Sequence, residues 1–241
     1  MVKPDRDRAI RIREIHAKTD PSFRPAHRLL TRVFPRAEML PLRAWVHVLE
    51  EHDAGVWSDI NWHLFVAERD GRTVGAATGT YLGNVNVGLI GYIALQASIR
   101  SLGVGPHLRW ALRLAFERDA RRLRDRPLGA VVGEVAPDNP WLRRLVGHGA
   151  IPLDVPYVQP SLRPRAHPVP FVLYYQSIGA PRSSIPADEV RRLLYAIWRR
   201  AYRIDRPLRH PAFRKMLRSL AGRARVGPRR LAARPPSATR T

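Results

Sequence analysis

The sequence predicts an α/β protein with a central sheet, flanking helices and a helical extension at the C-terminus. Strand-like and helix-like patterns alternate along residues 9–177, which indicates one α/β domain. An apolar run, Val87 to Leu95, leads through a glycine turn into a long helical pattern, His107 to Leu123. The chain of 241 residues, 45% of them hydrophobic, is long enough for one sizeable core and an extension.

The first elements are a strand and two helices. Ile10 to Ile15 alternates between apolar and charged residues, as a half-buried strand does. Phe23 to Val33 and Leu42 to His52 have helical patterns, and Pro35 and Pro41 break the chain between them.

A hairpin and the central strands come next. Trp62 to Glu68 and Thr73 to Leu82 are strand-like, and Asp70-Gly71 between them favours a tight turn that needs positive φ at both positions. Leu128 to Val135 is apolar up to Glu134, so we expect a central strand. After a short helix from Asn139 to Gly147 we expect two last strands, at 151–157 and 171–175.

The turn between the strand at Val87–Leu95 and the following helix has the features of an anion site. Gly103 and Gly105 allow the backbone to approach a ligand closely, and the free N–H groups of the helix start point at an anion. Pro106 suits the first helical position, and Arg100 can hold a phosphate through two parallel hydrogen bonds. The alternative is a tight turn that happens to begin a helix.

The run Arg100-x-x-Gly103-x-Gly105 resembles the acyl-CoA pyrophosphate loop of the GNAT superfamily of acetyltransferases, and the order of elements over residues 9–177 resembles the GNAT core. The resemblance implies a mixed, mostly antiparallel sheet and an acetyl-CoA-dependent N-acetyltransferase that transfers the acetyl group directly to an amine. Acetyl-CoA is the implied co-substrate, and no metal is implied. The residues that the resemblance assigns to acetyl-CoA are Leu95, Ala97, Arg100, Leu102, Gly103, Val104, Gly105 and Asn139.

The run Glu134 to Asn139 resembles the end of the fifth strand in ribosomal-protein N-acetyltransferases of the same superfamily. There the glutamate is the expected base, and a carboxylate at this edge could remove the proton of an ammonium before it attacks the thioester. A solvated or ion-paired strand-end glutamate is the alternative for Glu134. Asn139 is expected to cap the following helix and to lie near the pantetheine arm.

The sequence departs from the superfamily where a tyrosine usually protonates the departing thiolate. Val146 stands at that position, and the remaining candidates for a general acid are His148 and Tyr157. A turn histidine and a packing tyrosine are the alternatives, and a thiolate can also leave unprotonated. A non-catalytic, acyl-CoA-binding GNAT-like protein with a basic arm for nucleic acid or membrane therefore stays open as a second function.

Composition restricts the remaining classes. The chain has no cysteine, so disulfides and thiol nucleophiles are excluded, and its histidines lack zinc-type spacing. The N-terminus lacks a hydrophobic signal region and no apolar run spans a membrane, so we expect a cytoplasmic protein. The acidic cluster Glu50 to Asp53 is interpreted as a solvated surface or as a lining for a cationic amine, whether a small molecule or a peptide.

Most of the excess positive charge is C-terminal. The net charge is +22, and residues 181–241 contribute 17 basic and three acidic residues, a net of +14. We divide the chain into a GNAT domain (1–180), a basic helical extension (181–221) and a disordered basic tail (222–241). The extension is expected to form an amphipathic helix, Ala187 to Tyr202, and a second helix, Pro211 to Ala221. Its apolar stripe favours packing against the core; a homodimer contact and a membrane or nucleic-acid contact are the alternatives.

Overall fold

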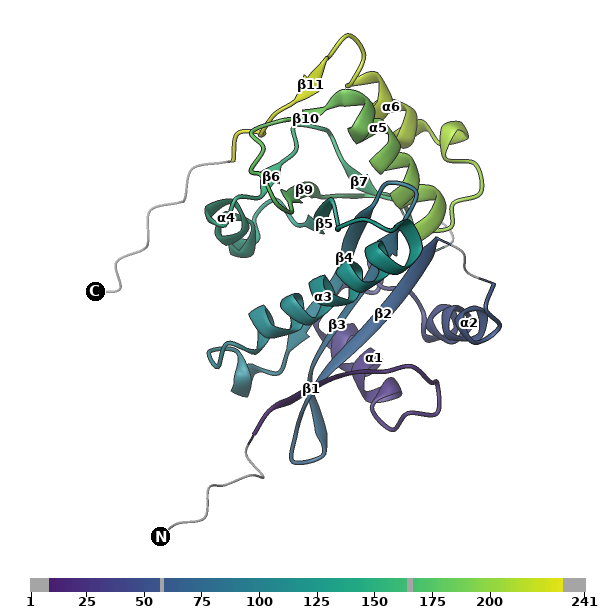
Figure 1. The fold of residues 1–241 in the computed structure, drawn as a ribbon, viewed down its shortest axis with the longest axis vertical. Coiled ribbons are helices and arrows are strands. Elements are labelled where there is room, and N and C mark those ends of the chain that lie inside the picture. The colour runs from purple at the N-terminus through teal and green to yellow at the C-terminus, as the bar shows by residue number, and fades with distance from the viewer. Residues whose placement is uncertain (1–8, 57–58, 164–166, 232–241) are drawn as a thin grey trace, which may run out of the picture.

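The computed structural model describes residues 9–56, 59–163 and 167–231, and it confirms the predicted α/β class (Figure 1). A seven-stranded sheet has the order β1-β2-β3-β4-β5-β9-β6, in which only β4 and β5 are parallel neighbours. Its strands are β1 (Arg11–Glu14), β2 (Ile60–Arg69), β3 (Arg72–Leu82), β4 (Val87–Leu95), β5 (Ala130–Val135), β6 (Ile151–Pro152) and β9 (Val172–Ser177). Two small sheets pair β7 (Val158–Gln159) with β8 (Val169–Pro170), and β10 (Ile185–Pro186) with β11 (Arg225–Val226).

Helices cover both faces of the large sheet because the strand residues alternate between the two. One face packs against α3 (Val104–Arg124) and α4 (Pro140–Gly147), in contact with residues such as Ala77, Val131 and Val172. The other face packs against α1 (Phe23–Val33) and α2 (Leu42–Asp53) along β2–β4, and against the extension along β5 and β9. Whether a residue is at an odd or an even position of its strand therefore decides on which face of the sheet its side chain lies.

The sheet opens between its two parallel strands. A bulge in β4 leaves Gly91 without a partner, because Thr78 pairs with Tyr92 and Gly79 with Ile90. Pairing between β4 and β5 runs only from Val87 to Ile90 on β4. Beyond that point β4 pairs with β3 alone and the end of β5 pairs with β9 alone. The two strands therefore diverge toward their carboxyl ends.

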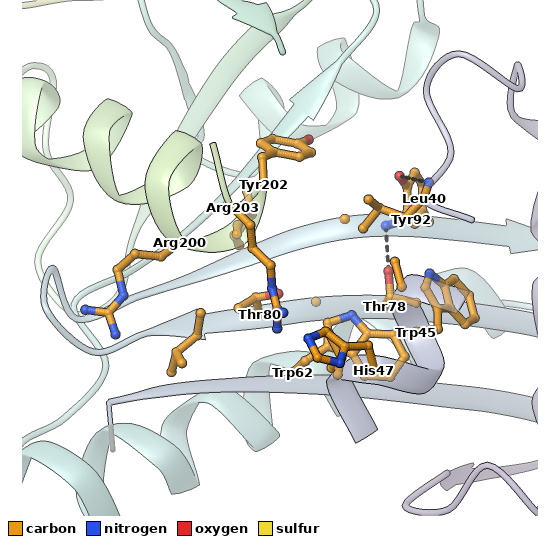
Figure 2. A pocket seen from close by; sticks show the side chains of 17 residues that line it. Leu40, Trp45, His47, Trp62, Thr78, Thr80, Tyr92, Arg200, Tyr202 and Arg203 are labelled. Atoms are coloured by element: carbon orange, nitrogen blue, oxygen red, sulfur yellow. Dashed lines mark hydrogen bonds between the residues drawn. The ribbon is translucent and has the colours of Figure 1, made fainter. Parts of the chain in front are cut away.

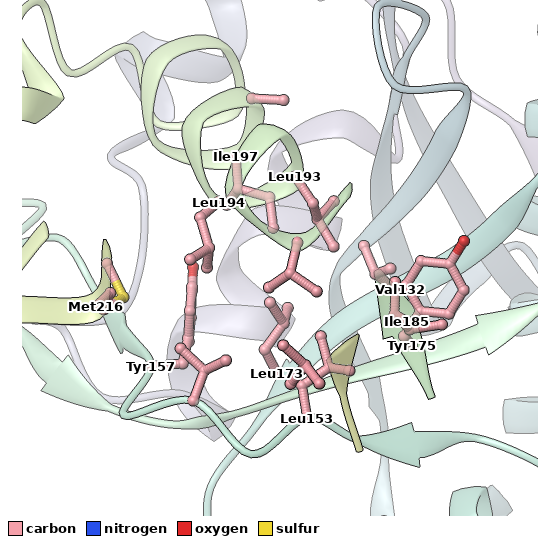
Figure 3. Packing of buried hydrophobic residues seen from close by; sticks show 14 of the residues in the cluster. Val132, Leu153, Tyr157, Leu173, Tyr175, Ile185, Leu193, Leu194, Ile197 and Met216 are labelled. Carbon is pink, nitrogen blue, oxygen red and sulfur yellow. The ribbon is translucent and has the colours of Figure 1, made fainter. Parts of the chain in front are cut away.

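The predicted amphipathic helix of the extension is present and docks on the core. It consists of α5 (Ala187–Ala196), continued by one π-helical turn, η3 (Ile197–Ala201). Its predicted stripe packs on β5 and β9, where Leu193, Leu194 and Ile197 meet Val132 and Leu173 (Figure 3). The helix α6 (Pro211–Arg218) adds Phe213 and Met216 to the same cluster. This burial confirms the interpretation of the stripe as a core contact, and the core continues across the boundary drawn at residue 180.

The expectation of disorder from residue 222 onward is wrong for residues 222–231. The strand β11 pairs with β10, and Val226 is fully buried in the core cluster. Pro228 then forms a bridge with Leu153, and the amide of Arg229 donates to the Pro152 carbonyl at 2.8 Å. The arginine and proline content of this segment predicts disorder and outweighs the apolar residue, Val226, that attaches it to the core. Residues 232–241 of the expected tail lie outside the described residues.

Two other boundaries differ from the sequence-based expectations. The helix α3 begins at Val104, so Pro106 is its third residue and not its first. The strand expected over residues 151–157 is only β6 plus a bridge at Leu153, because Pro152 and Pro156 have no amide hydrogen for a sheet ladder. Within the described part of the chain, we find no helix of the length and apolarity that a membrane crossing requires.

Candidate active site

Glu134 lies at the end of β5, just past the last residue that pairs with β4. Its neighbours Gly133 and Val135 face α3 and α4, so alternation turns the Glu134 side chain to the face covered by α2 and the extension. The side chain is partly buried among tyrosines. This position beside the opening in the sheet agrees with the edge that the sequence predicts for a base.

Two phenols hold the carboxylate. Tyr157 donates its hydroxyl hydrogen to Oε1 of Glu134, and Tyr202 donates its own to Oε2. Burial raises the pKa of Glu134 to about 7, although both hydrogen bonds oppose the increase. Burial and the neighbouring carboxylate hold the pKa values of both tyrosines well above their ordinary range. Glu134 can therefore take up and release a proton near neutral pH while both phenols keep theirs.

A cavity of about 160 Å³ lies next to this cluster, on the same face of the sheet (Figure 2). Its floor is the middle of β3 and β4, including the bulge residue Gly91. One wall is α2 with Trp45, and the opposite wall is the end of the extension with Tyr202. Tyr202 lines this cavity and its hydroxyl binds Glu134, so this residue lies between the cavity and the carboxylate.

Ion pairs between the extension and the core close the rim of this cavity. The guanidinium of Arg200 makes two hydrogen bonds to the Asp59 carboxylate, and that of Arg203 makes two to Glu51 of α2. His47, which also lines the cavity, lies 3.2 Å from the same Glu51 carboxylate. Of the acidic cluster interpreted as a solvated surface or as the lining of an amine site, Glu51 is at this rim, where it pairs with Arg203.

The predicted pyrophosphate loop is at the opposite edge of the opening, between β4 and α3. Gly103 has φ of 74° and precedes α3, whose first backbone bond is from His107 to Gly103. The amides of Val104 and Gly105 thus have no partner within the helix, as an anion site requires. The amide of Leu102 donates instead to the Ile99 carbonyl at 3.2 Å, so Leu102 supplies no free N–H group.

The remaining residues assigned to acetyl-CoA lie around the same opening. Leu95 ends β4 and pairs only with β3, which leaves its other edge toward β5 unpaired. Ala97 follows in a short 3-10 helix, η2 (Ala97–Ile99), and the exposed Arg100 places its Nε 3.5 Å from the Leu95 carbonyl. Asn139 caps α4 as predicted, because its side chain accepts from the Trp141 amide at 2.9 Å.

The structure separates the two candidates for the general acid. Tyr157 contacts Glu134, whereas His148 ends α4 on the opposite face, where its Nδ1 lies 2.6 Å from the Arg144 carbonyl. Val146 is exposed on α4 and brings no phenol to the site. A second cavity lies between α3 and α4, where Arg109 bonds Tyr174 and Gln176 of β9 at 2.8 and 2.7 Å. In the described ranges no histidine and acidic side chains cluster in a way that could hold a metal ion.

Sequence reasoning missed Tyr202 as a site residue. The sequence pattern places it at the end of an amphipathic helix. In the structure it follows a π-helical turn, in which its amide donates to the Ile197 carbonyl at 3.0 Å, and its hydroxyl reaches Glu134. The two tyrosines are 23 and 68 positions from Glu134 in the chain, so local spacing predicts neither contact. The one feature of the sequence that could have indicated Tyr202 is its place directly after the apolar stripe that packs the extension on the core.

Comparison with known proteins agrees with this fold. The model of the Acetyltransferase (GNAT) family matches residues 34–125, from the end of α1 to the end of α3. A GNAT-family protein from Bacteroides thetaiotaomicron has a TM-score of 0.56 at 17% identity, over 81% of this chain and 99% of its own.

Two further solved structures match nearly their whole length to about seven tenths of this chain. A protein from Staphylococcus epidermidis assigned as an acetyltransferase has a TM-score of 0.52 at 12% identity, over 71% of this chain and 100% of its own. One from Acinetobacter baylyi, also assigned as an acetyltransferase, has a TM-score of 0.50 at 13% identity, over 72% and 95% of the two chains. Identities at this level show a shared fold. A search of curated proteins found no match.

Proposed function

Residues 34–125 match the model of the Acetyltransferase (GNAT) family, and from this match we propose that the chain transfers an acetyl group from acetyl-CoA directly to an amine. The observation that carries the proposal is Glu134, a buried carboxylate with a pKa of about 7 beside the opening between β4 and β5. A base with a pKa near the working pH is suited to deprotonating an ammonium group. The small cavity beside it gives the amine a place to bind.

The donor side has groups that fit acetyl-CoA. The unpaired amides at the start of α3 and the guanidinium of Arg100 would hold the pyrophosphate. Nothing lies within 4 Å of a Cβ built on Gly103, so the loop leaves room for a phosphate at close range. The free edge of β4 at Leu95, with Ala97 just after the strand, would bond the pantetheine amides, and Asn139 would flank that arm. Acetyl-CoA supplies the acetyl thioester.

We assign proton removal to Glu134 acting through Tyr202. Tyr202 lines the cavity and its hydroxyl already donates to Glu134. The Tyr202 oxygen accepts the proton of the bound ammonium as its own proton moves to Oε2 of Glu134. The neutral amine then attacks the thioester carbonyl carbon, the carbon–sulfur bond breaks, and CoA leaves as the thiolate. The amide nitrogen gives up its second proton to the thiolate or to water, which completes the neutral amide.

Tyr157 supports the carboxylate in this proposal. It is only 1% exposed and directs its hydroxyl at Oε1, so it fixes the orientation of Glu134. Protonation of the departing thiolate by Tyr157, the role expected from the sequence, stays a prediction. Thiols are acidic enough for the thiolate to leave without this step.

The test is thiol release from acetyl-CoA over a panel of amines, with each product identified by its mass. Acetylated product in the presence of the wild type, and its loss in Glu134→Gln, would support the proposal. The exposed Val146 in place of the superfamily tyrosine favours the second candidate, a non-catalytic acyl-CoA-binding protein. Binding of acetyl-CoA in calorimetry without turnover of any amine would support that candidate instead.

A further inference from the structure

We infer that the cavity beside Tyr202 takes a monoamine that carries one aromatic ring, or an apolar group of similar size, as the acetyl acceptor. The inference rests on the proposed function and narrows its acceptor, since amines of several classes fit the fold alone. It follows from three properties of the cavity, namely its size, its aromatic walls and the pairing of its charges.

The size of the cavity suits one ring. Its volume is about 160 Å³. An engineered apolar cavity of about 150 Å³ in another protein binds benzene, so a phenyl group is of the right size here. Tyr202 lines the cavity, so an amine attached to the ring through a short linker could reach this residue.

The walls are aromatic and held in place. The rings of Trp45 and Trp62 lie 5.3 Å apart at 59°, a tilted arrangement typical of packed aromatic pairs. Trp45 is 1% exposed and packs in the cluster between α1, α2 and the sheet. Tyr92 is fixed by donating its hydroxyl hydrogen to the Glu38 carbonyl at 2.6 Å. A rigid aromatic wall favours a flat apolar body over a flexible polar chain.

The charges at the rim are already paired. Both arginines that line the cavity bind carboxylates in two places each, Arg200 with Asp59 and Arg203 with Glu51. Among the described residues that line the cavity, none is an aspartate or a glutamate. A second ammonium group on the acceptor would therefore enter without a carboxylate partner, at a cost in desolvation. Polyamines and aminoglycosides are disfavoured for this reason.

The backbone conformation at the end of the extension positions this segment as a wall of the cavity. Arg203 has φ of 58°, a left-handed conformation that is sterically unfavourable for a non-glycine residue. This turn directs Arg203 back over the cavity to Glu51, directly after Tyr202 has reached Glu134. The ion pair with α2 thus holds the end of the extension across the mouth of the cavity.

The experiment compares acceptors of similar reactivity. Phenethylamine, spermidine and a short lysine peptide are supplied with acetyl-CoA, and kcat/KM is measured by thiol release and product mass. We expect kcat/KM for phenethylamine to exceed that for spermidine by about 100-fold or more, because the site leaves the additional ammonium groups unpaired. Equal or better use of spermidine or of the peptide would overturn the inference and leave acetyl transfer intact.

A variant pair tests the location. Ala44→Phe on α2 fills the cavity with a ring, whereas Arg43→Phe adds the same side chain to the neighbouring exposed position outside it. We expect Ala44→Phe to lower kcat/KM for phenethylamine at least tenfold, and Arg43→Phe to leave it within about twofold. Melting by circular dichroism verifies that both variants are folded. Equal effects of the two substitutions would contradict this location.

A binding measurement separates this inference from the proposed function. N,N-dimethylphenethylamine has the same ring and cannot form a stable amide, so its binding needs no turnover. We expect it to quench the fluorescence of Trp45 and Trp62 in the wild type and in Arg43→Phe, but not in Ala44→Phe. Quenching without any acetyl transfer would uphold the cavity and reject the proposed function. Absence of quenching with phenethylamine turnover would reject the cavity alone.

Discussion

Glu134 has the properties of a base only while its carboxylate remains in its apolar setting. Desolvation raises its pKa to about 7, and the hydrogen bonds from Tyr157 and Tyr202 prevent a larger increase. Acceptance of a proton needs the ionised form, whose population grows as the pH rises through about 7. Below that pH the group is protonated and cannot accept the proton of an ammonium.

The first prediction concerns this carboxylate. Glu134→Gln keeps the shape of the side chain and removes the proton acceptor. We expect turnover to fall about 10²- to 10⁴-fold, with little change in CoA affinity by calorimetry. The wild-type rate should rise with pH through about 7, and the variant should lose this part of its profile. Turnover within threefold of the wild type at pH 7 would falsify the catalytic role.

The second prediction concerns His63, a buried imidazole outside the site. Its Nδ1 lies 2.5 Å from Glu14 and its Nε2 lies 2.7 Å from Asp119, with the side chain 5% exposed. Burial opposes the charged form, but the two carboxylates together raise the pKa of His63 above 6.5, and His63 lowers the pKa values of both acids. The two carboxylates therefore favour the imidazolium form of His63 in the folded protein.

The stability that this cluster gives to the fold depends on pH. The contribution of His63 to the free energy of unfolding is fully present below pH 6.5 and is lost as the pH rises through its raised pKa. The contribution of Glu14 is present above pH 4.5 and is lost as the pH falls. We expect His63→Gln to lower the unfolding free energy by roughly 3–5 kcal/mol at pH 5.5. Denaturant unfolding should show a smaller loss at pH 9; a difference independent of pH, or an equal loss in the exposed control His107→Gln, would contradict this.

At the scale of single residues, the sequence could indicate which side chains are candidates for acid–base chemistry, but not which of them contact one another. Glu134 followed from its place at the end of an apolar strand, and Tyr157 followed from its nearness in the chain to Val146, which stands where the superfamily has a tyrosine. Their direct hydrogen bond depends on the antiparallel pairing of β5 with β9 and on the loop between β6 and β7. Tyr202 is 68 positions from Glu134, and only the docked extension brings the two together.

At the scale of elements, the loop before α3 shows the preference of glycine for positive φ, which can be recognised from the sequence. Gly103 adopts φ of 74°, a left-handed conformation that glycine reaches without a steric penalty. Positive φ also occurs in the hairpin, where Asp70 and Gly71 have φ of 52° and 67°. Turn chemistry is local, so it can be predicted without knowledge of the fold. The short strand β6 could not be predicted so well, since its apolar run is interrupted by prolines whose effect depends on the partner strand.

The third prediction tests this loop as the CoA site. Arg100→Ala removes a charged phosphate contact, which commonly contributes about 1.5–3 kcal/mol, so CoA binding should weaken roughly tenfold or more. Gly103→Val should be worse, because valine resists positive φ and its side chain fills the space where the phosphate would lie. Calorimetry with CoA measures both, and Arg72→Ala on the hairpin is a control for loss of charge. Unchanged CoA affinity in Arg100→Ala would remove this residue from the site.

At the scale of the whole molecule, the extension is part of the core and of the active site together. Val190, Leu193, Leu194, Ile197 and Trp198 are each at most 1% exposed against β5 and β9, and each such burial contributes about 1.5–3 kcal/mol. The same helix ends at Tyr202, which binds Glu134. Loss of the extension should therefore remove stability and the proton path in one step, unlike the loss of a separate basic arm.

The final prediction concerns residues 222–231, whose composition predicts no contribution to stability. In the structure Val226 is fully buried, the amide of Ala187 donates to the Ala224 carbonyl at 3.0 Å, and Pro228 bridges Leu153. Two chains ending at residues 221 and 231 differ only by this segment. Burial of one valine contributes about 1.5–3 kcal/mol, and each kcal/mol shifts the Tm of a domain of this size by about 2–4 °C.

We therefore expect the chain ending at 221 to melt several degrees below the chain ending at 231. Val226→Asp in the full chain should lower the Tm at least as much, because it buries a carboxylate without a partner. Arg223→Ala is the matched control, since this partly exposed side chain only bonds Asp154 at the surface. Equal melting of the two truncated chains would mean that β11 adds nothing to the core, and that α5 docks on β5 and β9 without it.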